Sequence, residues 1–423
     1  MEVKKQIYLS HLAYESFDKK FSRNYFSTFY IIKGFFIALC LSLFIYLEYF
    51  SLHVEILNTI LAVIGFYGLL TCEKKTLTWV GFFIGVFWFY WIGFGFGYYD
   101  LVYLIPLVII GFGLIYGLFF WIISFAGITP EIRALLMFGF VFFSPFGFNW
   151  FKPELILINS YFSTDIYLYG LFLIIITIMI RWKIVGILLL IALSFFNKPV
   201  HVELPKLDIA IPITNLDQNK KWKKEYRKEI VEQNFFLIKK AIKSKKDLII
   251  LHESAFPLYL NLELKTLNRL KKLSYEIAIV TGGLHVKENL VYNSSYFFSN
   301  GKFEIADKVV LVPFGEKIPL PKWAVDIINN IFFNGADDYK NAQNVFDFEI
   351  KNYSFRNAIC YEATTDKLYE NSPKYMIAIS NNAWFTPSIE PTLQNLLLKL
   401  HAKKYNTIIY HSANSGISGI ITP

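Results

Sequence analysis

Long apolar stretches follow one another through the first half of the chain, and they restrict its fold more than any other feature. They cover residues 29–50, 54–71, 77–97, 101–125, 133–150, 164–180 and 183–196. Most of them approach the roughly 20 residues that a helix needs to cross a bilayer core. The last is short, but Lys183 and Lys198 flank it, and such side chains can reach from a helix end to the interface. We predict a membrane domain of about seven helices over residues 29–196.

Basic residues alternate from loop to loop and predict the orientation of this domain. They occur in the tail over residues 1–28, at Lys74 and Lys75, at Arg133, and at Arg181 and Lys183. The intervening loops carry almost none. Because cytoplasmic loops have an excess of Lys and Arg, we expect the N-terminal tail in the cytoplasm. An odd number of spans then places residues 197–423 on the opposite side.

The composition supports a membrane protein and argues against several other classes. Of 423 residues, 55% are apolar, and the apolar excess lies before residue 197. The net charge of +9 fits basic loops beside anionic lipid better than a nucleic-acid site. Cys40, Cys72 and Cys360 have neither the spacing of a metal site nor that of a disulfide framework. We expect no metal, no cofactor and no nucleic-acid partner.

Short strand-like runs and helical patterns alternate after residue 197, which indicates a layered α/β domain. Strands are predicted at 207–214, 247–253, 276–281, 291–299, 303–312, 353–360, 375–380 and 407–412. Residues 216–246 show the apolar spacing of a helix. Asn300 and Gly301 stand between two strand-like runs, a strong hairpin signal.

Three polar residues lie at or near the ends of apolar runs and together make a catalytic set. Glu253 closes one run, Lys308 precedes another, and Cys360 ends a third. A thiolate needs a base and a nearby positive charge, and an acyl-transfer oxyanion needs donors aimed at it. Taken singly, each residue has an ordinary structural explanation, such as a small buried thiol for Cys360. His252 and His411 are further candidates for the base, if the fold brings them close.

The motifs, in their order, resemble those of the apolipoprotein N-acyltransferases, membrane members of the nitrilase superfamily. The most specific are KVVLVPFGE (308–316) and ICYE (359–362). Three further matches are VYNSS (291–295), SNNAWF (380–385) and ANSGIS (413–418). The resemblance is close after residue 207 and mainly architectural before it. It implies a four-layer αββα nitrilase-like fold for residues 197–423, outside the membrane.

The resemblance also implies roles for individual residues. Glu253 would be the general base, Cys360 the nucleophile, and Lys308 the group that stabilises the oxyanion, with the backbone N–H of Tyr361 as second donor. Other matched positions are Glu316, Tyr361 and Glu362, which would support this triad, and Trp222, Trp384, Tyr292 and Asn293, which would contact substrate. Asn382 stands where the family often has Asp. The chain ends at Pro423 without the family's final membrane helix, so we expect a short variant or a truncation.

The implied reaction has two steps. Cys360 takes an acyl chain from a phospholipid, typically phosphatidylethanolamine, and the thioester then acylates the N-terminal amino group of a diacylglyceryl-cysteine apolipoprotein. The implied location is the bacterial inner membrane, with the catalytic domain on the periplasmic side. Two alternatives share parts of this set: a membrane-anchored nitrilase-type amidase that uses water, and a non-catalytic lipid- or lipoprotein-binding relative in which Cys360→Ala changes nothing.

Overall fold

The computed structural model describes residues 27–197, 200, 202–317, 322, 325 and 339–423. The predicted tail over residues 1–28 lies almost wholly outside these residues. The chain divides into two compact units. The helical unit comprises Met1–Val141 and Asn159–Asn197, and the sheet unit comprises Phe142–Ile158 and Lys198–Pro423. A segment from within the predicted membrane domain, Phe142–Ile158, therefore groups with the sheet unit.

The helical unit follows the apolar stretches of the sequence. Its helices are α2 (Thr28–Tyr49), α3 (Glu55–Thr71), α4 (Lys74–Phe89), α5 (Ile105–Ala126), α6 (Pro130–Gly139), α7 (Ile166–Arg181) and α8 (Lys183–Ser194). The 3-10 turns η1 (Tyr90–Tyr99) and η2 (Val102–Leu104) connect α4 to α5. Among the described residues, three helical stretches are long and apolar enough to cross a membrane: Thr28–Tyr49, Lys74–Tyr98 and Val102–Ala126.

The other predicted spans are shorter than expected, and seven spans stay a prediction. Helices α7 and α8 have 16 and 12 residues, which is about 24 and 18 Å at 1.5 Å per residue, against a core of about 30 Å. The prediction of one span over 133–150 is wrong in its extent, because α6 ends at Gly139. Pro145 follows, and the residue before a proline is disfavoured in a helix.

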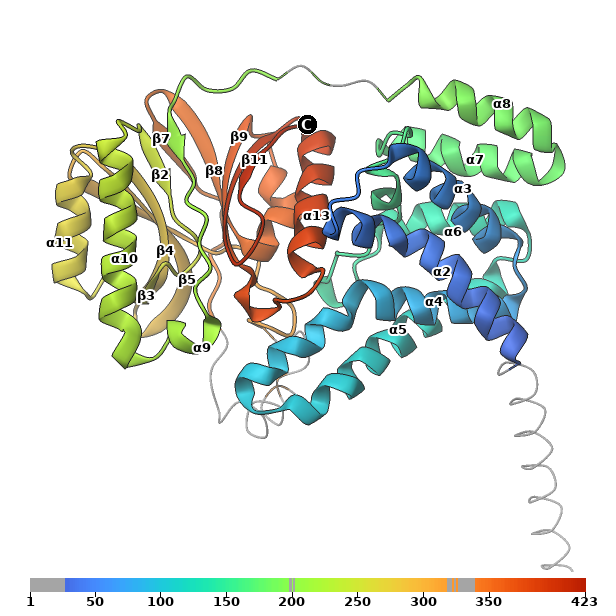
Figure 1. Ribbon diagram of the computed structural model, residues 1–423, viewed down its shortest axis with the longest axis horizontal. Coiled ribbons are helices and arrows are strands. Elements are labelled where there is room, and N and C mark those ends of the chain that lie inside the picture. Colours follow the sequence, from blue (N-terminus) through green and yellow to red (C-terminus); the bar gives the residue numbers. More distant parts are fainter. Residues whose placement is uncertain (1–26, 198–199, 201, 318–321, 323–324, 326–338) are drawn as a thin grey trace, which may run out of the picture. The chain divides into compact units, whose positions relative to one another are not determined.

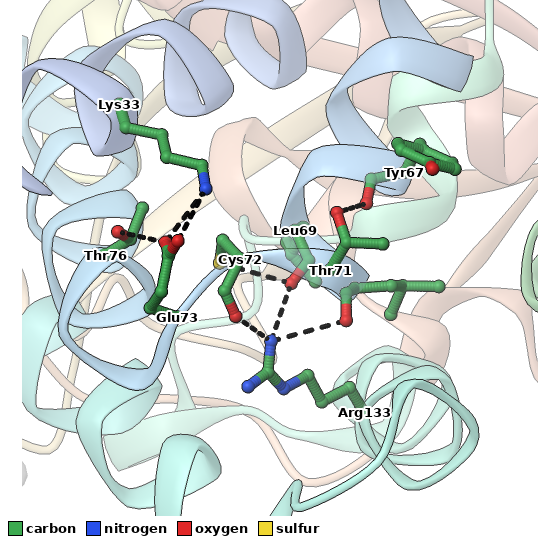
Figure 2. A network of polar contacts seen from close by, with 9 residues as sticks. Lys33, Tyr67, Leu69, Thr71, Cys72, Glu73, Thr76 and Arg133 are labelled. Carbon is green, nitrogen blue, oxygen red and sulfur yellow. Dashed lines mark hydrogen bonds and ion pairs between the residues drawn. The ribbon is translucent and has the colours of Figure 1, made fainter. Parts of the chain in front are cut away.

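A network of polar contacts bonds to backbone groups at several helix ends of the helical unit (Figure 2). Arg133 is 6% exposed. Its Nε donates to the carbonyl of Gly127 at 2.9 Å and its Nη1 to the carbonyl of Cys72 at 2.5 Å. The last carbonyls of a helix have no partner within the helix, so a cation there satisfies and stabilises them. Lys33 of α2 forms an ion pair of 2.9 Å with Glu73, the residue before α4.

The sheet unit contains two sheets. One is built from β1 (Ile209–Ala210), β2 (Leu248–Ile250), β4 (Ala278–Lys287), β5 (Leu290–Ser299) and β6 (Lys302–Asp307) in that order, with β3 (Phe256–Tyr259) paired to β4. The other has the order β11 (Gly419–Ile421), β10 (Ile408–Asn414), β9 (Tyr375–Asn381), β8 (Tyr353–Ile359) and β7 (Asp347–Ile350). Strands β1, β2 and β4 are parallel, as are β8, β9 and β10.

Alternate residues of the central strands point into different layers, and this alternation builds the four-layer fold. On β2, Leu248 and Ile250 enter the core between the two sheets, whereas Ile249 enters the core beneath the helices α10 (Lys224–Lys243) and α11 (Leu264–Leu273). On β9, Ile377 faces the other sheet and Met376 faces α13 (Glu390–Tyr405). The helices thus cover the outer faces (Figure 1). The predicted fold class, an apolar helical domain followed by an αββα domain, is confirmed.

The hairpin prediction is confirmed. Asn300 and Gly301 have φ of 51° and 76° and join β5 to β6. This is the left-handed pair that a two-residue hairpin turn favours.

The strand predicted over 303–312 ends earlier than expected, at Asp307. Beyond it, the backbone N–H groups of Val309 and Val310 donate to the side chain of Glu362 in place of a neighbouring strand.

Candidate active site

The three candidate catalytic residues follow the carboxyl ends of three strands. Lys308 comes directly after β6 and Cys360 directly after β8, and Glu253 lies three residues beyond β2. Strand β5 is antiparallel to both β4 and β6, and β4 is parallel to β2. Strands β2 and β6 therefore end at the same edge of their sheet, where parallel strands commonly present functional groups.

An asparagine and a second glutamate join Glu253 to Lys308. Asn293 Nδ2 donates to Glu253 Oε1 at 2.7 Å and to Glu316 Oε1 at 3.0 Å. The other oxygen of Glu316 lies 2.7 Å from Lys308 Nζ and accepts from the backbone N–H of Val312 at 2.9 Å. Asn293, predicted to contact substrate, thus lies between two carboxylates and bridges them by hydrogen bonds.

Glu362 connects the turn that contains Cys360 to the segment that follows Lys308. Its Oε2 accepts from the N–H groups of Val309 and Val310 at 2.7 and 2.9 Å, and its Oε1 accepts from the N–H of Ile359 at 2.8 Å. The side chain is fully buried. Burial raises the pKa of Glu362 to about 7 although Lys308 and these N–H groups lower it. This carboxyl group therefore fixes two parts of the site relative to each other.

Cys360 has a strained backbone, and its thiol is protonated in the resting state. Its φ is 56°, in the left-handed region that few residues with a side chain adopt, and such strain is concentrated at functional sites. Part of its surface is accessible. Burial raises the pKa of the thiol, the charge of Glu253 raises it further, and Lys308 lowers it. The resting sulfur is therefore protonated and needs a base to become a nucleophile.

The charges of Glu253 and Lys308 depend on each other. Burial raises the pKa of Glu253, and the positive charge of Lys308 lowers it. Burial alone would lower the pKa of Lys308, but Glu316, Glu253 and neighbouring acidic groups raise it above its ordinary value, so this amine stays protonated. A carboxylate with raised proton affinity beside a fixed cation suits general base catalysis near neutral pH.

Tyr361 is held by the segment Phe142–Ile158. Its hydroxyl donates to the carbonyl of Gly147 at 2.7 Å and accepts from the N–H of Asn149 at 3.2 Å. The rings of Phe148 and Trp150 stack with its ring at centroid distances of 6.1 Å. These contacts fix the residue directly after Cys360. No pattern in this apolar segment predicted that it would supply them.

Trp222, Trp384 and Tyr292 are the remaining predicted site residues. Trp222 follows α9 (Gln218–Lys221) directly and is 38% exposed. Trp384 ends the short turn η8 (Asn382–Trp384) after β9. Tyr292 precedes Asn293 on β5, so it points to the opposite face, where its ring lies 5.9 Å from that of His285. Contact of these three residues with substrate stays a prediction.

Sequence reasoning missed Lys221, a second buried cation. Its side chain is fully buried, and Nζ donates to the backbone carbonyl of Glu253 at 2.9 Å. Burial lowers the pKa of Lys221 to about 7, against the charges of Glu253 and Cys360, which raise it. Only its place beside Trp222 could have drawn attention to it. His252 and His411 are also buried, which lowers their pKa values to about 3 and about 4, so both rings are neutral.

The cations that the structure places near Cys360 are the lysines Lys308 and Lys221. Across the described ranges, no group of three or more His, Cys, Asp and Glu side chains is arranged to hold a metal ion. The arrangement of a strained thiol, a carboxylate with raised pKa and a protonated lysine can instead support acyl transfer through a thioester.

Sequence comparisons cover nearly the whole chain. A family described as the apolipoprotein N-acyltransferase integral membrane domain matches residues 28–198. Apolipoprotein N-acyltransferase of Wolinella succinogenes is 43% identical over 391 residues, 91% of this chain and 94% of that protein. The Helicobacter pylori protein of the same name is 38% identical over 87% of this chain and 88% of that one.

Structural comparison gives a weaker likeness. A CN-hydrolase superfamily protein from Xanthomonas campestris is 15% identical, with a TM-score of 0.37, over 51% of this chain and 78% of that protein. The sequence relatives, by contrast, match both units at high identity and almost full length. On that evidence the chain belongs to the apolipoprotein N-acyltransferase family.

Proposed function

We propose that this protein is an apolipoprotein N-acyltransferase that works through a cysteine thioester. The acyl donor is a phospholipid, with phosphatidylethanolamine as the leading candidate, and the acceptor is the N-terminal amino group of a diacylglyceryl-cysteine apolipoprotein. The observation that carries the proposal is the connected group of Glu253, Asn293, Glu316 and Lys308 near the strained Cys360. The relatives that bear this name match the chain over 94% and 88% of their own length.

In the first step the thiol of Cys360 gives its proton to Glu253 as the sulfur attacks the ester carbonyl of the phospholipid. The C–S bond forms and the carbonyl oxygen becomes an oxyanion, which Lys308 and the backbone N–H of Tyr361 stabilise. Collapse of this intermediate breaks the ester C–O bond. The lysophospholipid leaves with the proton held by Glu253, and the acyl chain remains on Cys360 as a thioester.

The second step reverses these roles with a different nucleophile. The amino group of the apolipoprotein attacks the thioester carbonyl, and Glu253 accepts the proton that the amine loses. Collapse forms the amide and breaks the C–S bond, and the proton returns to Cys360. Both substrates are anchored in lipid, which accounts for the joining of this chemistry to a membrane domain. The alternation of basic loops supports an inner-membrane location with the sheet unit on the periplasmic side.

Intact-mass measurement tests the first step. The purified full chain is incubated with phosphatidylethanolamine, beside Cys360→Ala and the matched control Cys40→Ala, whose cysteine lies in α2. We expect one acyl adduct, removable by hydroxylamine, on the parent and on Cys40→Ala only. A folded parent protein without an adduct would contradict the proposal, as would an adduct that survives in Cys360→Ala. A diacylglyceryl-cysteine peptide added afterwards should remove the adduct and gain its mass.

A further inference from the structure

Three buried side chains that the proposed reaction does not use lie beside the nucleophile. Gln394 and Glu390 belong to α13, and Asn382 begins η8 after β9. None of the three is more than 2% exposed. Such burial is costly for polar groups unless they are hydrogen-bonded, so their bonding pattern shows what each group can present to Cys360.

The hydrogen bonds of Asn382 determine which end of the Gln394 amide faces the sulfur of Cys360. Asn382 Nδ2 donates to Gln394 Oε1 at 2.9 Å and to the two oxygens of Glu390 at 3.0 and 2.8 Å. Since the oxygen of Gln394 is occupied by this donor, its amide nitrogen is turned the other way. Gln394 Nε2 then donates to Cys360 Sγ at 3.8 Å.

We propose that Gln394 is a further catalytic residue, whose amide N–H stabilises Cys360 Sγ as the thiolate forms, and that Asn382 and Glu390 are positioning residues that hold this amide in its donating orientation. The inference rests on the proposed function, because it takes Cys360 as the nucleophile. It adds an uncharged side-chain donor beside the ionisable groups Glu253 and Lys308.

The charges around Cys360 explain why a neutral donor is useful there. Glu253, Glu316 and Glu390 disfavour the thiolate of Cys360 when they are ionised, and the sulfur also lies within electrostatic range of Lys308 and Lys221. Lys308 is already paired with Glu316 at 2.7 Å. An N–H group aimed at the sulfur stabilises developing negative charge without adding a further ion to the cluster.

Glu390 suits the positioning role because it anchors Asn382 without adding much charge. Burial raises the pKa of Glu390 to about 8, while the hydrogen bond from Asn382 lowers it. Near neutral pH the group is therefore mostly uncharged, and its oxygens still accept from the amide. Above that pH it becomes an anion near the sulfur, which disfavours the thiolate.

Alkylation of Cys360 by iodoacetamide, followed across pH on the full chain and read by peptide mass spectrometry, tests the inference. The variant Gln394→Met keeps the side-chain length and removes the donor. We expect alkylation about tenfold slower at pH 8, because a hydrogen bond to a charged group is worth about 1.5 kcal/mol or more. The rise of the rate with pH should also move to higher pH. Glu390→Gln keeps the acceptor and should stay within about twofold of the parent at pH 7.

The matched control is Asn261→Leu, because the amide of Asn261 hydrogen-bonds with the backbone of Val286 and is not among the residues assigned to the site. It should lower the melting temperature and leave alkylation of Cys360 unchanged. If Gln394→Met is folded and keeps the parent's rate and pH profile, the inference is overturned.

A second variant decides the matter if Gln394→Met does not fold. Asn382→Leu has a similar size and adds no charge, but it removes the donor that holds Gln394 Oε1, so the amide of Gln394 is no longer fixed with its nitrogen toward the sulfur. We expect slower alkylation, and an unchanged profile overturns the inference. Alkylation needs no lipid, so a parent protein that fails to form a thioester but depends on Gln394 for alkylation would contradict the proposed function alone.

Discussion

Arg133 of the helical unit and Lys308 of the sheet unit are both buried cations, and they have different partners. Arg133 of the helical unit donates to backbone carbonyls at the ends of helices. Lys308 of the sheet unit is fully buried and lies 2.7 Å from a carboxylate that also shares Asn293 with Glu253. Neutral partners give Arg133 a fixed structural task, whereas ionisable partners make the charge of Lys308 part of a proton-sensitive cluster.

The difference follows from the chemistry of the two side chains. Arginine stays charged and has five N–H donors in a planar fork, which suits several carbonyls at once. Lysine is a compact point charge that responds to its surroundings and can face a developing oxyanion. A buried cation is therefore not by itself a sign of catalysis, and its partners tell the two roles apart. Substitution of each cation tests this distinction.

Lys308→Met should have the largest effect. Loss of an oxyanion-stabilising group lowers the rate by about 10²–10³-fold, so we expect acyl-enzyme formation with phosphatidylethanolamine to fall at least that far in an intact-mass time course. Removal of one partner of a buried ion pair also leaves Glu316 uncompensated and lowers stability. The control is Lys317→Met, an exposed lysine nearby, which should match the parent. A folded Lys308→Met with near-parental rate contradicts the assigned role.

Arg133→Met, in contrast to Lys308→Met, should lower the stability of the protein and leave the rate of acyl-enzyme formation nearly unchanged. The carbonyls of Gly127 and Cys72 lose their donor, at a cost of about 1–3 kcal/mol for each buried group left unpaired. We expect a lower melting temperature in detergent with acyl-enzyme formation within about twofold of the parent per folded molecule. Arg181→Met is the control, because its ion pair with Glu131 is exposed and contributes little. Equal melting temperatures for the two variants would contradict the structural role of Arg133.

Lys221→Met should produce a smaller, pH-dependent change. The pKa of Lys221 is lowered to about 7 in the fold, whereas an unfolded lysine titrates near 10.4. Between these values the unfolded chain binds more protons, so stability rises with pH. From pH 7 to pH 9 we expect the free energy of unfolding of the parent to rise by about 2 kcal/mol relative to that of Lys221→Met. Melting temperatures across this range measure it, with the exposed Lys220→Met as control; parallel curves for parent and Lys221→Met would contradict it.

The sequence predicted the parts of the protein that local patterns determine. Strand-like apolar runs predicted most of the strands, although not the short strands β3, β7 and β11, and Asn300-Gly301 predicted the hairpin. The ends of apolar runs pointed to Glu253, Lys308 and Cys360, because α/β proteins commonly place functional groups at the carboxyl ends of strands. Strands β2 and β6 belong to one sheet and β8 to the other. The family resemblance supplied the fold of the second half and the supporting positions of Glu316 and Glu362.

The sequence could not predict features that depend on contacts between distant segments. Lys221 and Lys220 are adjacent in a lysine-rich stretch, and only the packed fold buries the first and exposes the second. Arg133 reads as a loop charge, although it bonds to the carbonyl of Cys72, 61 residues away. The end of α6 at Gly139 was not predicted, because the apolar stretch continues past it and across Pro145.

Tyr361→Phe should have the smallest effect, and it tests the segment Phe142–Ile158, which follows α6 in sequence but groups with the sheet unit. The hydroxyl donates to the carbonyl of Gly147 and accepts from the N–H of Asn149. Loss of these bonds costs about 1–3 kcal/mol, while the ring and the backbone N–H remain. We therefore expect a slightly lower melting temperature and a change in acyl-enzyme formation below about tenfold. A loss as large as that of Lys308→Met would mean that the hydroxyl itself takes part in the chemistry.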